Sequence, residues 1–505
     1  MKSYLTVIIF LSLFLYSCGH GPVADKHETE FPNIIIIYAD DLGYGDPGAY
    51  GGKAIKTPNM DRLAGEGIRF TRGYASSATC TPSRYALLTG TYPWRNKEAR
   101  ILPGSASLII DTSLITIPKM LKEQGYVTAI VGKWHLGLGV GDIDWNKHIS
   151  PGPNEVGFDY SYILAATQDR VPTVYIENGN VVGLDPDDPI EVSYRHPFPG
   201  EITGKDHPEL LKMKLSQGHD GTIVNGISRI GHMKGGEQAR WIDEYMADTF
   251  LIKAQDFIRA HKDQPFFLYY AMQQPHVPRT PNPKFVGKTE LGPRGDVIAE
   301  ADWCIGELMK TLEGQGLRKN TLVILSSDNG PVLDDGYQDG AFEKNGNHKP
   351  WGPLRGGKYS LYEAGTRVPF VTYWPGRIRP GVSQAMVSQV DLLNSLAELT
   401  GSRERTTDGK DLLEVLLGKS DEGRDVMVFD AMGKTGFRKD EWVMIPPYPG
   451  PAFAEDVQIE LGNSDSYQLY NLKDDPGQKN NLAGEEKEKL KEMTKEYKKI
   501  TKGIN

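Results

Sequence analysis

An uninterrupted apolar run near the start of the chain constrains the fold more than any other feature. Residues 34–37 are four consecutive isoleucines, preceded by Asn33 and followed by Tyr38-Ala39. β-Branched residues favour extended backbone, and a strand without polar alternation is buried on both faces. Such strands belong to parallel sheets that helices cover on both sides. The run therefore predicts an α/β protein.

The same alternation of helix and strand continues along the chain. Helices are predicted at about 116–124, 241–261, 296–315 and 387–400, and further strands at 127–131, 265–271 and 321–325. Beyond 408–422, short strands near 426–429 and 468–472 precede a charged helix from about 485. We expect a large mixed, mainly parallel sheet sandwiched by helices, with a smaller C-terminal α+β subdomain of a short antiparallel sheet and a helix.

Each of the four predicted core strands ends in polar residues that carry chemistry. These are Asp40-Asp41, Lys133 with His135, His276, and Asp328-Asn329. Taken singly, each is more simply read as a polar turn or a solvated charge. Together they fall at the edge where α/β folds bind ligands, and adjacent buried carboxylates repel unless a cation separates them. The oxygen donors, without His or Cys at zinc-site spacing, fit one Ca²⁺, or alternatively Mg²⁺.

A short segment, Cys80-Thr81-Pro82-Ser83-Arg84, leads into Leu87-Leu88-Thr89-Gly90. Proline is tolerated in the first turn of a helix and glycine ends one, so Cys80 is predicted at a helix N-terminus, which attracts anions. Arg84, one turn later, adds a fixed cation. The segment predicts a reactive group that faces an anionic substrate. The alternative is a buried cysteine in a short helix.

The C-T-P-S-R and L-L-T-G motifs resemble the signature of the type I, formylglycine-dependent sulfatases of the alkaline phosphatase superfamily. Gly357-Lys358 ahead of the segment Glu363 to Pro369 is similar to the same family. The resemblance implies an alkaline-phosphatase-like fold and a sulfuric ester hydrolase. It further implies that Cys80 is oxidised to Cα-formylglycine, whose hydrate attacks sulfur and later expels sulfate as the aldehyde re-forms. A formylglycine-generating or anaerobic sulfatase-maturing enzyme is the implied partner.

The resemblance also assigns roles to individual residues. The implied ligands of one divalent ion, usually Ca²⁺, are Asp40, Asp41, Cys80, Asp328 and Asn329. The implied catalytic residues are Cys80, Arg84, Lys133, His135, His276 and Lys358. His135 would act as base on the formylglycine hydrate, with Lys133 on the sulfate. His276, assisted by Lys358, would protonate the leaving oxygen.

A long polar stretch at 157–240 is where we expect substrate specificity to reside. Asp169, Arg170 and His219 are its candidates for binding sugar hydroxyls, beside Lys133, His276 and Lys358. The alternative is an internal ion pair and a capped turn. The stretch resembles carbohydrate sulfatases that act on 6-O-sulfated galactose or N-acetylgalactosamine. The expected substrate is thus a sulfated glycan, such as a glycosaminoglycan, a mucin or an algal polysaccharide.

The N-terminal residues read as a targeting segment. Lys2, the apolar residues 5–15 and the sequence Leu-Tyr-Ser-Cys-Gly ending at residue 19 resemble the signal of a bacterial lipoprotein. We predict a signal peptide at 1–18, lipidation of Cys18, a tether at 19–30, a catalytic domain at 31–420 and a C-terminal subdomain at 421–505. The expected location is lipid-anchored in the outer membrane or periplasm, or alternatively soluble in the periplasm. Cys304 is then left for the core, without a disulfide.

Charge and motif content limit the other functions. The net charge of −9 argues against nucleic acid as a partner. One alternative is a phosphodiesterase or phosphonate monoester hydrolase of the same superfamily, whose phosphatase members generally carry Ser or Thr and more metals. Another is a non-catalytic glycan-binding lipoprotein, which is expected to lack the cysteine, a ligand or a histidine. None of these is missing from this chain.

Overall fold

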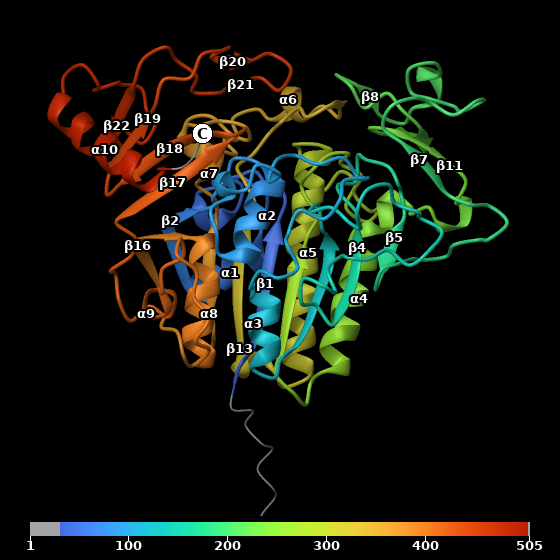
Figure 1. Cartoon of the computed structure of the whole chain (residues 1–505), viewed down its shortest axis with the longest axis horizontal. Helices are drawn as coiled ribbons and strands as arrows, with labels where there is room; N and C mark the ends of the chain where they lie inside the picture. The colour runs from blue at the N-terminus through green and yellow to red at the C-terminus, as the bar shows by residue number, and fades with distance from the viewer. Residues whose placement is uncertain (1–30, 503–505) are drawn as a thin grey trace, which may run out of the picture.

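The computed structural model of the chain describes residues 31–502, and a ten-stranded sheet forms its centre (Figure 1). From edge to edge the strands are β16 (Gly381–Ser388), β2 (Ile68–Tyr74), β15 (Phe370–Tyr373), β13 (Thr321–Ser327), β1 (Asn33–Ala39), β12 (Phe266–Ala271), β3 (Val127–Lys133), β4 (Tyr160–Leu164), β5 (Tyr175–Glu177) and β6 (Asn180–Val181). The predicted signal peptide, Cys18 and the whole predicted tether at 19–30 lie outside the described residues and stay predictions.

The middle of the sheet is parallel and its flanks are mixed. β13, β1, β12, β3 and β4 all run in one direction. β15 pairs antiparallel with β13 and β2, and β5 pairs antiparallel with β4 and β6. The predicted mixed, mainly parallel sheet is therefore confirmed.

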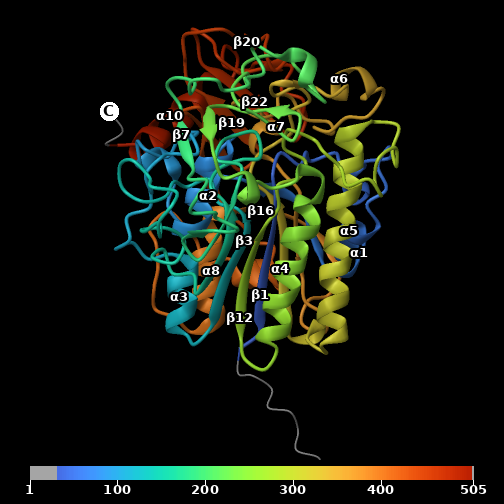
Figure 2. The same cartoon turned by 90° about the vertical axis from the view of Figure 1, so that its right-hand side faces the viewer.

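The isoleucine run of β1 feeds two separate cores, one on each face of the sheet. Ile34 and Ile36 pack in the cluster that contains residues of α2 (Cys80–Thr89), α3 (Ile117–Glu123) and α8 (Leu392–Thr400). Ile35 and Ile37 pack in the cluster with α1 (Pro58–Glu66), α4 (Met246–Ala260) and α5 (Pro293–Gly314). Figure 2 shows these two sets of helices on opposite sides of the sheet. Successive strand residues point to opposite faces, which is why the run has no polar alternation.

The C-terminal part forms a second, smaller sheet at the carboxyl end of the parallel strands (Figure 1). β17 (Val426–Ala431), β18 (Lys434–Lys439), β19 (Trp442–Ile445) and β22 (Gln468–Asn471) pair antiparallel in that order. α10 (Lys487–Ile500) covers this sheet by burying Met493 against it. The predicted antiparallel sheet and helix are confirmed, whereas the boundary at 420/421 stays a prediction.

Two of the predicted helices begin too early. Residues 381–388 form β16, which pairs with β2, and α8 begins only at Leu392. A reciprocal hydrogen-bonded cap between Ser388 and Asp391 separates the strand from the helix. Similarly, α4 begins at Met246, after a 3₁₀ turn at Asp243–Tyr245. In both places an apolar residue ahead of the helix is buried while it belongs to a strand or a loop. Its burial therefore does not indicate that the helix extends to it.

Small pairings organise the long stretch between β4 and α4. β8 (Lys214–Leu215) pairs antiparallel with β14 (Tyr337–Gln338), which belongs to the segment after β13. Ser216 also donates a hydrogen bond to Asp334, 2.6 Å away. The stretch 157–240 is thereby attached to the segment that follows Asp328. Within residues 31–502, no helix combines the length and apolar character needed to cross a bilayer.

Candidate active site

The four predicted core strands lie side by side, in the order β13, β1, β12 and β3, so their carboxyl ends meet. Asp40 and Asp41 follow β1, and Lys133 is the last residue of β3. His276 comes after β12, and Asp328-Asn329 directly follow β13. The predicted convergence at one edge is confirmed. Asp41 and His135 both leave their strands in the left-handed region, at φ 67° and 55°.

Cys80 is the first residue of α2 and is 2% exposed. Its Sγ lies 3.3 Å from Nδ1 of His135, whose Nε2 lies 2.9 Å from the carbonyl oxygen of Leu102. Because only a protonated Nε2 satisfies that carbonyl, Nδ1 presents its lone pair to the sulfur. Burial and the charge of Lys133 hold the pKa of His135 well below its usual value. This geometry gives a neutral base directed at residue 80.

Arg84 is fully buried one turn into α2. Its Nε and one terminal nitrogen contact Oδ2 of Asp328 at 3.0 and 2.8 Å, and its other terminal nitrogen lies 3.1 Å from the carbonyl oxygen of Lys133. Burial raises the pKa of Asp328, but Arg84 and Lys133 outweigh it and lower that pKa. Arg84 thereby ties α2 to the ends of β13 and β3.

Two lysines each take one oxygen of the Asp40-Asp41 pair. Nζ of Lys133 lies 2.6 Å from Oδ2 of Asp40, and Nζ of Lys358 lies 2.9 Å from Oδ2 of Asp41. Asn329 donates from Nδ2 to Oδ1 of Asp41 at 2.7 Å. Among the described residues, this leaves Oδ1 of Asp40 and Oδ1 of Asn329 buried without a hydrogen-bond partner. Buried oxygens without partners are costly, and a cation would satisfy them.

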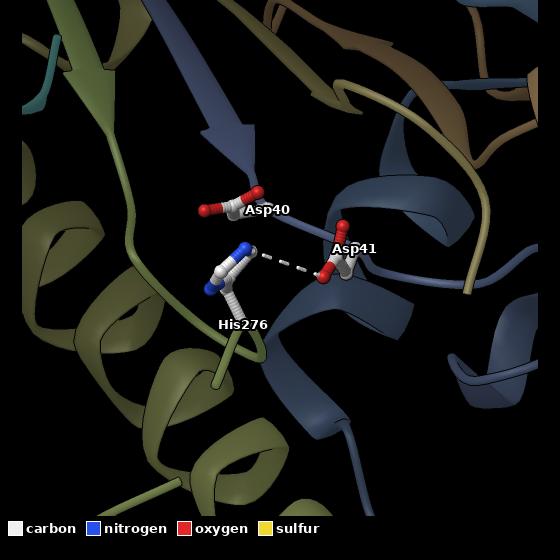
Figure 3. A group of neighbouring side chains, drawn as sticks. All are labelled: Asp40, Asp41 and His276. Carbon is white, nitrogen blue, oxygen red and sulfur yellow. Dashed lines mark ion pairs between the residues drawn. The ribbon is translucent and has the colours of Figure 1, made fainter. Parts of the chain in front are cut away.

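Asp40, Asp41 and His276 offer ligand atoms that all lie within 4.8 Å of one another (Figure 3). Nε2 of His276 lies 3.9 Å from Oδ2 of Asp41, and its Nδ1 lies 2.7 Å from the carbonyl oxygen of Val277. Burial, and after it the nearby Asp328, raise the pKa of Asp40 well above its usual range. The donor set fits a divalent cation. The sequence placed His276 with the catalytic residues, and the structure brings it to the carboxylates as well.

Of the predicted substrate-binding residues, Asp169, Arg170, His219, His276 and Lys358 line a cavity of about 410 Å³ that also includes Cys80, whereas Lys133 is not part of its lining. Nε2 of His219 lies 3.0 Å from Oδ2 of Asp169, and Arg170 contacts Oδ1 of Asp169 at 2.9 Å. The internal ion pair considered as the alternative is therefore present, and the same three residues face the cavity. Burial alone would raise the pKa of Asp169, but Arg170 and His219 hold it well below its usual range. The predicted site residues that do not line this cavity are joined by side-chain contacts next to it, and Lys358 connects the two groups through Asp41.

Among the cavity residues absent from the sequence prediction, Asp335 and Tyr359 form a contact chain to Lys358. Asp335 contacts Nζ of Lys358 at 2.8 Å, and the hydroxyl of Tyr359 donates to Asp335 at 2.9 Å. In the sequence, Asp334-Asp335-Gly336 has the composition of an ordinary polar turn. The neighbouring Lys358 was the one available signal, since a buried lysine requires a carboxylate partner.

Comparisons with known proteins agree with this geometry. The Sulfatase family matches residues 32–402. An N-acetylgalactosamine-6-O-sulfatase of Bacteroides thetaiotaomicron is 51% identical over 486 residues, which cover 95% of each chain. Human arylsulfatase A is 32% identical over 472 residues, covering 90% of this chain and 83% of its own.

A solved structure points the same way. It comes from work on the metabolism of multiple glycosaminoglycans by Bacteroides thetaiotaomicron, and its TM-score is 0.92 at 50% identity. The match covers 94% of this chain and 99% of the other. The relatives carry names for different substrates, so family membership fixes the reaction class and not the sugar. The chain belongs to the Sulfatase family and is an enzyme that hydrolyses sulfate esters.

Proposed function

We propose that the protein removes a 6-O-sulfate group from N-acetylgalactosamine, or alternatively from galactose, in a sulfated glycan. The observation that carries this proposal is the cavity, which has Cys80 and His135 on its floor and Asp169, Arg170 and His219 in its wall. The 51% identical relative, named for activity on N-acetylgalactosamine 6-O-sulfate, supports the choice of sugar and position.

The nucleophile we propose is formylglycine made from Cys80. The sulfur atom of Cys80 marks where a hydroxyl of the hydrated aldehyde would lie, and that hydroxyl supplies the attack on sulfur. Nδ1 of His135, 3.3 Å from this position, is placed to take its proton. The N-terminus of α2 and the ammonium of Lys133 add positive charge beside the sulfate.

The leaving side of the site is formed by His276 and Lys358. With Nδ1 of His276 bonded to the carbonyl of Val277, its Nε2 is the nitrogen that can serve the departing sugar oxygen. Asp40, Asp41, Asp328 and Asn329 would hold one divalent cation, which we propose to be Ca²⁺ because the donors are hard oxygens. Such an ion contributes electrostatic stabilisation of the sulfate charge.

Recognition of the sugar is proposed to rest on Asp169, Arg170 and His219. Asp169 is a buried acceptor and Arg170 a donor on adjacent residues, so their polar groups can pair with neighbouring hydroxyls of one pyranose ring. A fixed acceptor–donor pair discriminates by leaving its own groups unpaired when the wrong hydroxyl arrives.

Export and lipid anchoring through Cys18 are a further part of the proposal, supported by the lipoprotein-like N-terminal sequence. Labelling of cells with an alkyne fatty acid, for the natural protein and Cys18→Ala, tests it. We expect label on the natural chain alone. Equal labelling of the two would contradict the anchor, and no labelling of either would favour the soluble periplasmic form.

The central experiment joins a mass measurement to a substrate panel. The protein is co-expressed with a maturation enzyme, the tryptic peptide that contains residue 80 is weighed, and sulfate release is measured from galactose, N-acetylgalactosamine and N-acetylglucosamine sulfated at single positions. Cys80→Ala is the matched control. We expect the aldehyde, and release from 6-O-sulfated N-acetylgalactosamine above all others.

Three results would each overturn a different part of the proposal. Release from another sugar or another position would replace the substrate and leave the mechanism intact. Hydrolysis by protein whose Cys80 is unmodified would refute the formylglycine nucleophile. The aldehyde together with hydrolysis of phosphodiesters, and of no sulfate ester, would refute the proposed reaction.

A further inference from the structure

The ammonium of Lys358 lies between two carboxylates of different kinds. It is 2.9 Å from Oδ2 of Asp41 and 2.8 Å from Oδ2 of Asp335. Asp41 belongs to the group that can hold a cation, whereas Asp335 lies on the wall of the cavity and does not belong to that group. The Lys358 side chain is 2% exposed, so solvent cannot replace either partner.

Asp335 is itself held in place from two sides. The hydroxyl of Tyr359 donates to its two oxygens, at 2.9 and 3.1 Å. The preceding carboxyl, that of Asp334, accepts from Ser216 and from the amide of Gly336, and so fixes the turn that carries Asp335. Tyr359 reaches Asp335 from a left-handed backbone at φ 72°, a conformation that is sterically unfavourable for a residue other than glycine. Strain of this kind marks a position that the surrounding structure enforces.

The two carboxylates would have separate duties once a cation is present. A cation bound at Asp41 would compete with Lys358 for Oδ2 of Asp41, and its charge would repel the ammonium. We propose that Asp335 is a positioning residue that keeps Lys358 directed at the sulfate ester while Asp41 binds the cation. This inference rests on the proposed function, because it takes the sulfate ester and the cation as given.

The charges of the site agree with this role. Four buried or half-buried carboxylates face three cationic side chains: Asp40, Asp41, Asp328 and Asp335 against Arg84, Lys133 and Lys358. A dication changes this single excess negative charge into a single excess positive charge. That charge matches a sulfate monoester, which carries one negative charge. Without Asp335 and with the dication bound, the site would carry two excess positive charges. Of these four carboxylates, Asp41, a ligand of the cation, would be the one left in contact with Lys358.

The first test measures cation binding and needs no turnover. Ca²⁺ is titrated calorimetrically into the unmatured protein with Cys80 in place, for the natural chain, Asp335→Asn and Asp334→Asn. In Asp335→Asn, Lys358 has to leave its last carboxylate before Asp41 can bind the ion. We expect its Kd for Ca²⁺ to rise about tenfold or more, on the scale of one charge-assisted hydrogen bond. The matched control Asp334→Asn keeps a side-chain oxygen that can accept from Ser216 and Gly336, so it should change the Kd less than about threefold. An unchanged Kd in Asp335→Asn would overturn the proposal.

The second test separates positioning from general structural damage. Matured proteins are compared on the preferred sugar sulfate and on 4-nitrophenyl sulfate, whose phenolate leaves without help. We expect Asp335→Asn to lower kcat on the sugar sulfate about 10- to 100-fold, with a smaller change in KM and a smaller loss on the aryl sulfate. Equal losses of kcat on the two substrates would show a structural role and refute the inference.

A second variant covers the case in which Asp335→Asn does not fold. Tyr359→Phe keeps the charge of Asp335 and removes its hydroxyl partner. We therefore expect the same direction of change in the Kd for Ca²⁺ and in kcat on the sugar sulfate, with fold-changes about a third as large as those of Asp335→Asn or smaller. If the natural matured protein releases sulfate from none of the sugars, the proposed function is refuted. The Ca²⁺ titration would still decide the role of Asp335.

Discussion

Glu300 of α5 provides the most quantitative prediction, through the substitution Glu300→Gln. The side chain is 2% exposed, and its oxygens accept from the amide of Asn282 at 3.1 Å and from Nε2 of Gln274 at 3.5 Å. Burial raises the pKa of Glu300 to about 7, against opposing hydrogen bonds from Asn282 and Gln274. Of the charged groups that face it, Asp248 raises the pKa and Lys284 lowers it.

The direction of the pH effect follows from proton binding. The unfolded chain releases this proton near pH 4.5 and the folded chain near pH 7, so the folded state holds the proton more tightly. Stability is therefore lost as the pH rises through this window, by about 3 kcal/mol in full. A glutamine is neutral at every pH and escapes the loss. Between pH 5 and pH 8, Glu300→Gln should gain about 2 to 3 kcal/mol relative to the natural chain.

Urea unfolding at pH 5 and pH 8 measures this difference. The matched control is Glu313→Gln at the end of the same helix, where the side chain is 60% exposed. We expect the control to shift the free energy of unfolding by the same small amount at the two pH values. The reasoning is refuted when the advantage of Glu300→Gln over the natural chain is the same at pH 5 and pH 8, or larger at pH 5.

Three further predictions concern the base, the cation and the contact between the two sheets. His135→Gln should lower kcat for sulfate release about 10²- to 10⁴-fold in steady-state assays, and a loss below tenfold would remove His135 from the role of base. Chelation with EDTA should abolish sulfate release, and added Ca²⁺ should restore it. Full activity of a protein in which metal analysis finds no bound ion would contradict the cation site. Arg438→Met should cost about 3 to 5 kcal/mol in urea unfolding, because it leaves the buried Glu363 beside Tyr74 without its main charge partner, and Glu363→Gln in the same chain should recover part of that loss. A loss unaltered by the second substitution would show that lost packing, and not the unpaired carboxylate, sets the cost.

The parts of the fold that the sequence predicts are those with a repeated local pattern. The isoleucine run indicated a strand buried on both faces, and the polar residues at four strand ends indicated their common edge. Parallel connections have one hand, so a local pattern was enough to place Asp40, Lys133, His276 and Asp328 together. The predicted helix start at residue 387 was wrong because the pairing of β16 with β2 is a tertiary contact that local periodicity does not contain.

Asp335 and Tyr359 were missed for the same physical reason. Their segment has no regular structure, and its contacts join residues far apart in the chain, such as Ser216 with Asp334. His276 was predicted as a catalytic and substrate-binding residue but not as a neighbour of the cation ligands, because sequence spacing does not reveal that its ring reaches the carboxylates after β1. Loop positions of this kind become visible only when the chain is folded.

The pairing of β8 with β14 has a consequence for how specificity can be exchanged between sulfatases. The stretch 157–240 carries Asp169, Arg170 and His219, but one strand of it is completed by Tyr337–Gln338, more than a hundred residues later. A chimaera that received residues 157–240 alone would lack the strand Tyr337–Gln338 that pairs with β8. The transplanted stretch would also lie beside the recipient's own residues in place of the turn that carries Asp335. A working chimaera therefore has to inherit both segments together, and natural divergence of the sugar-binding wall is expected to proceed by paired changes in these two distant parts of the gene.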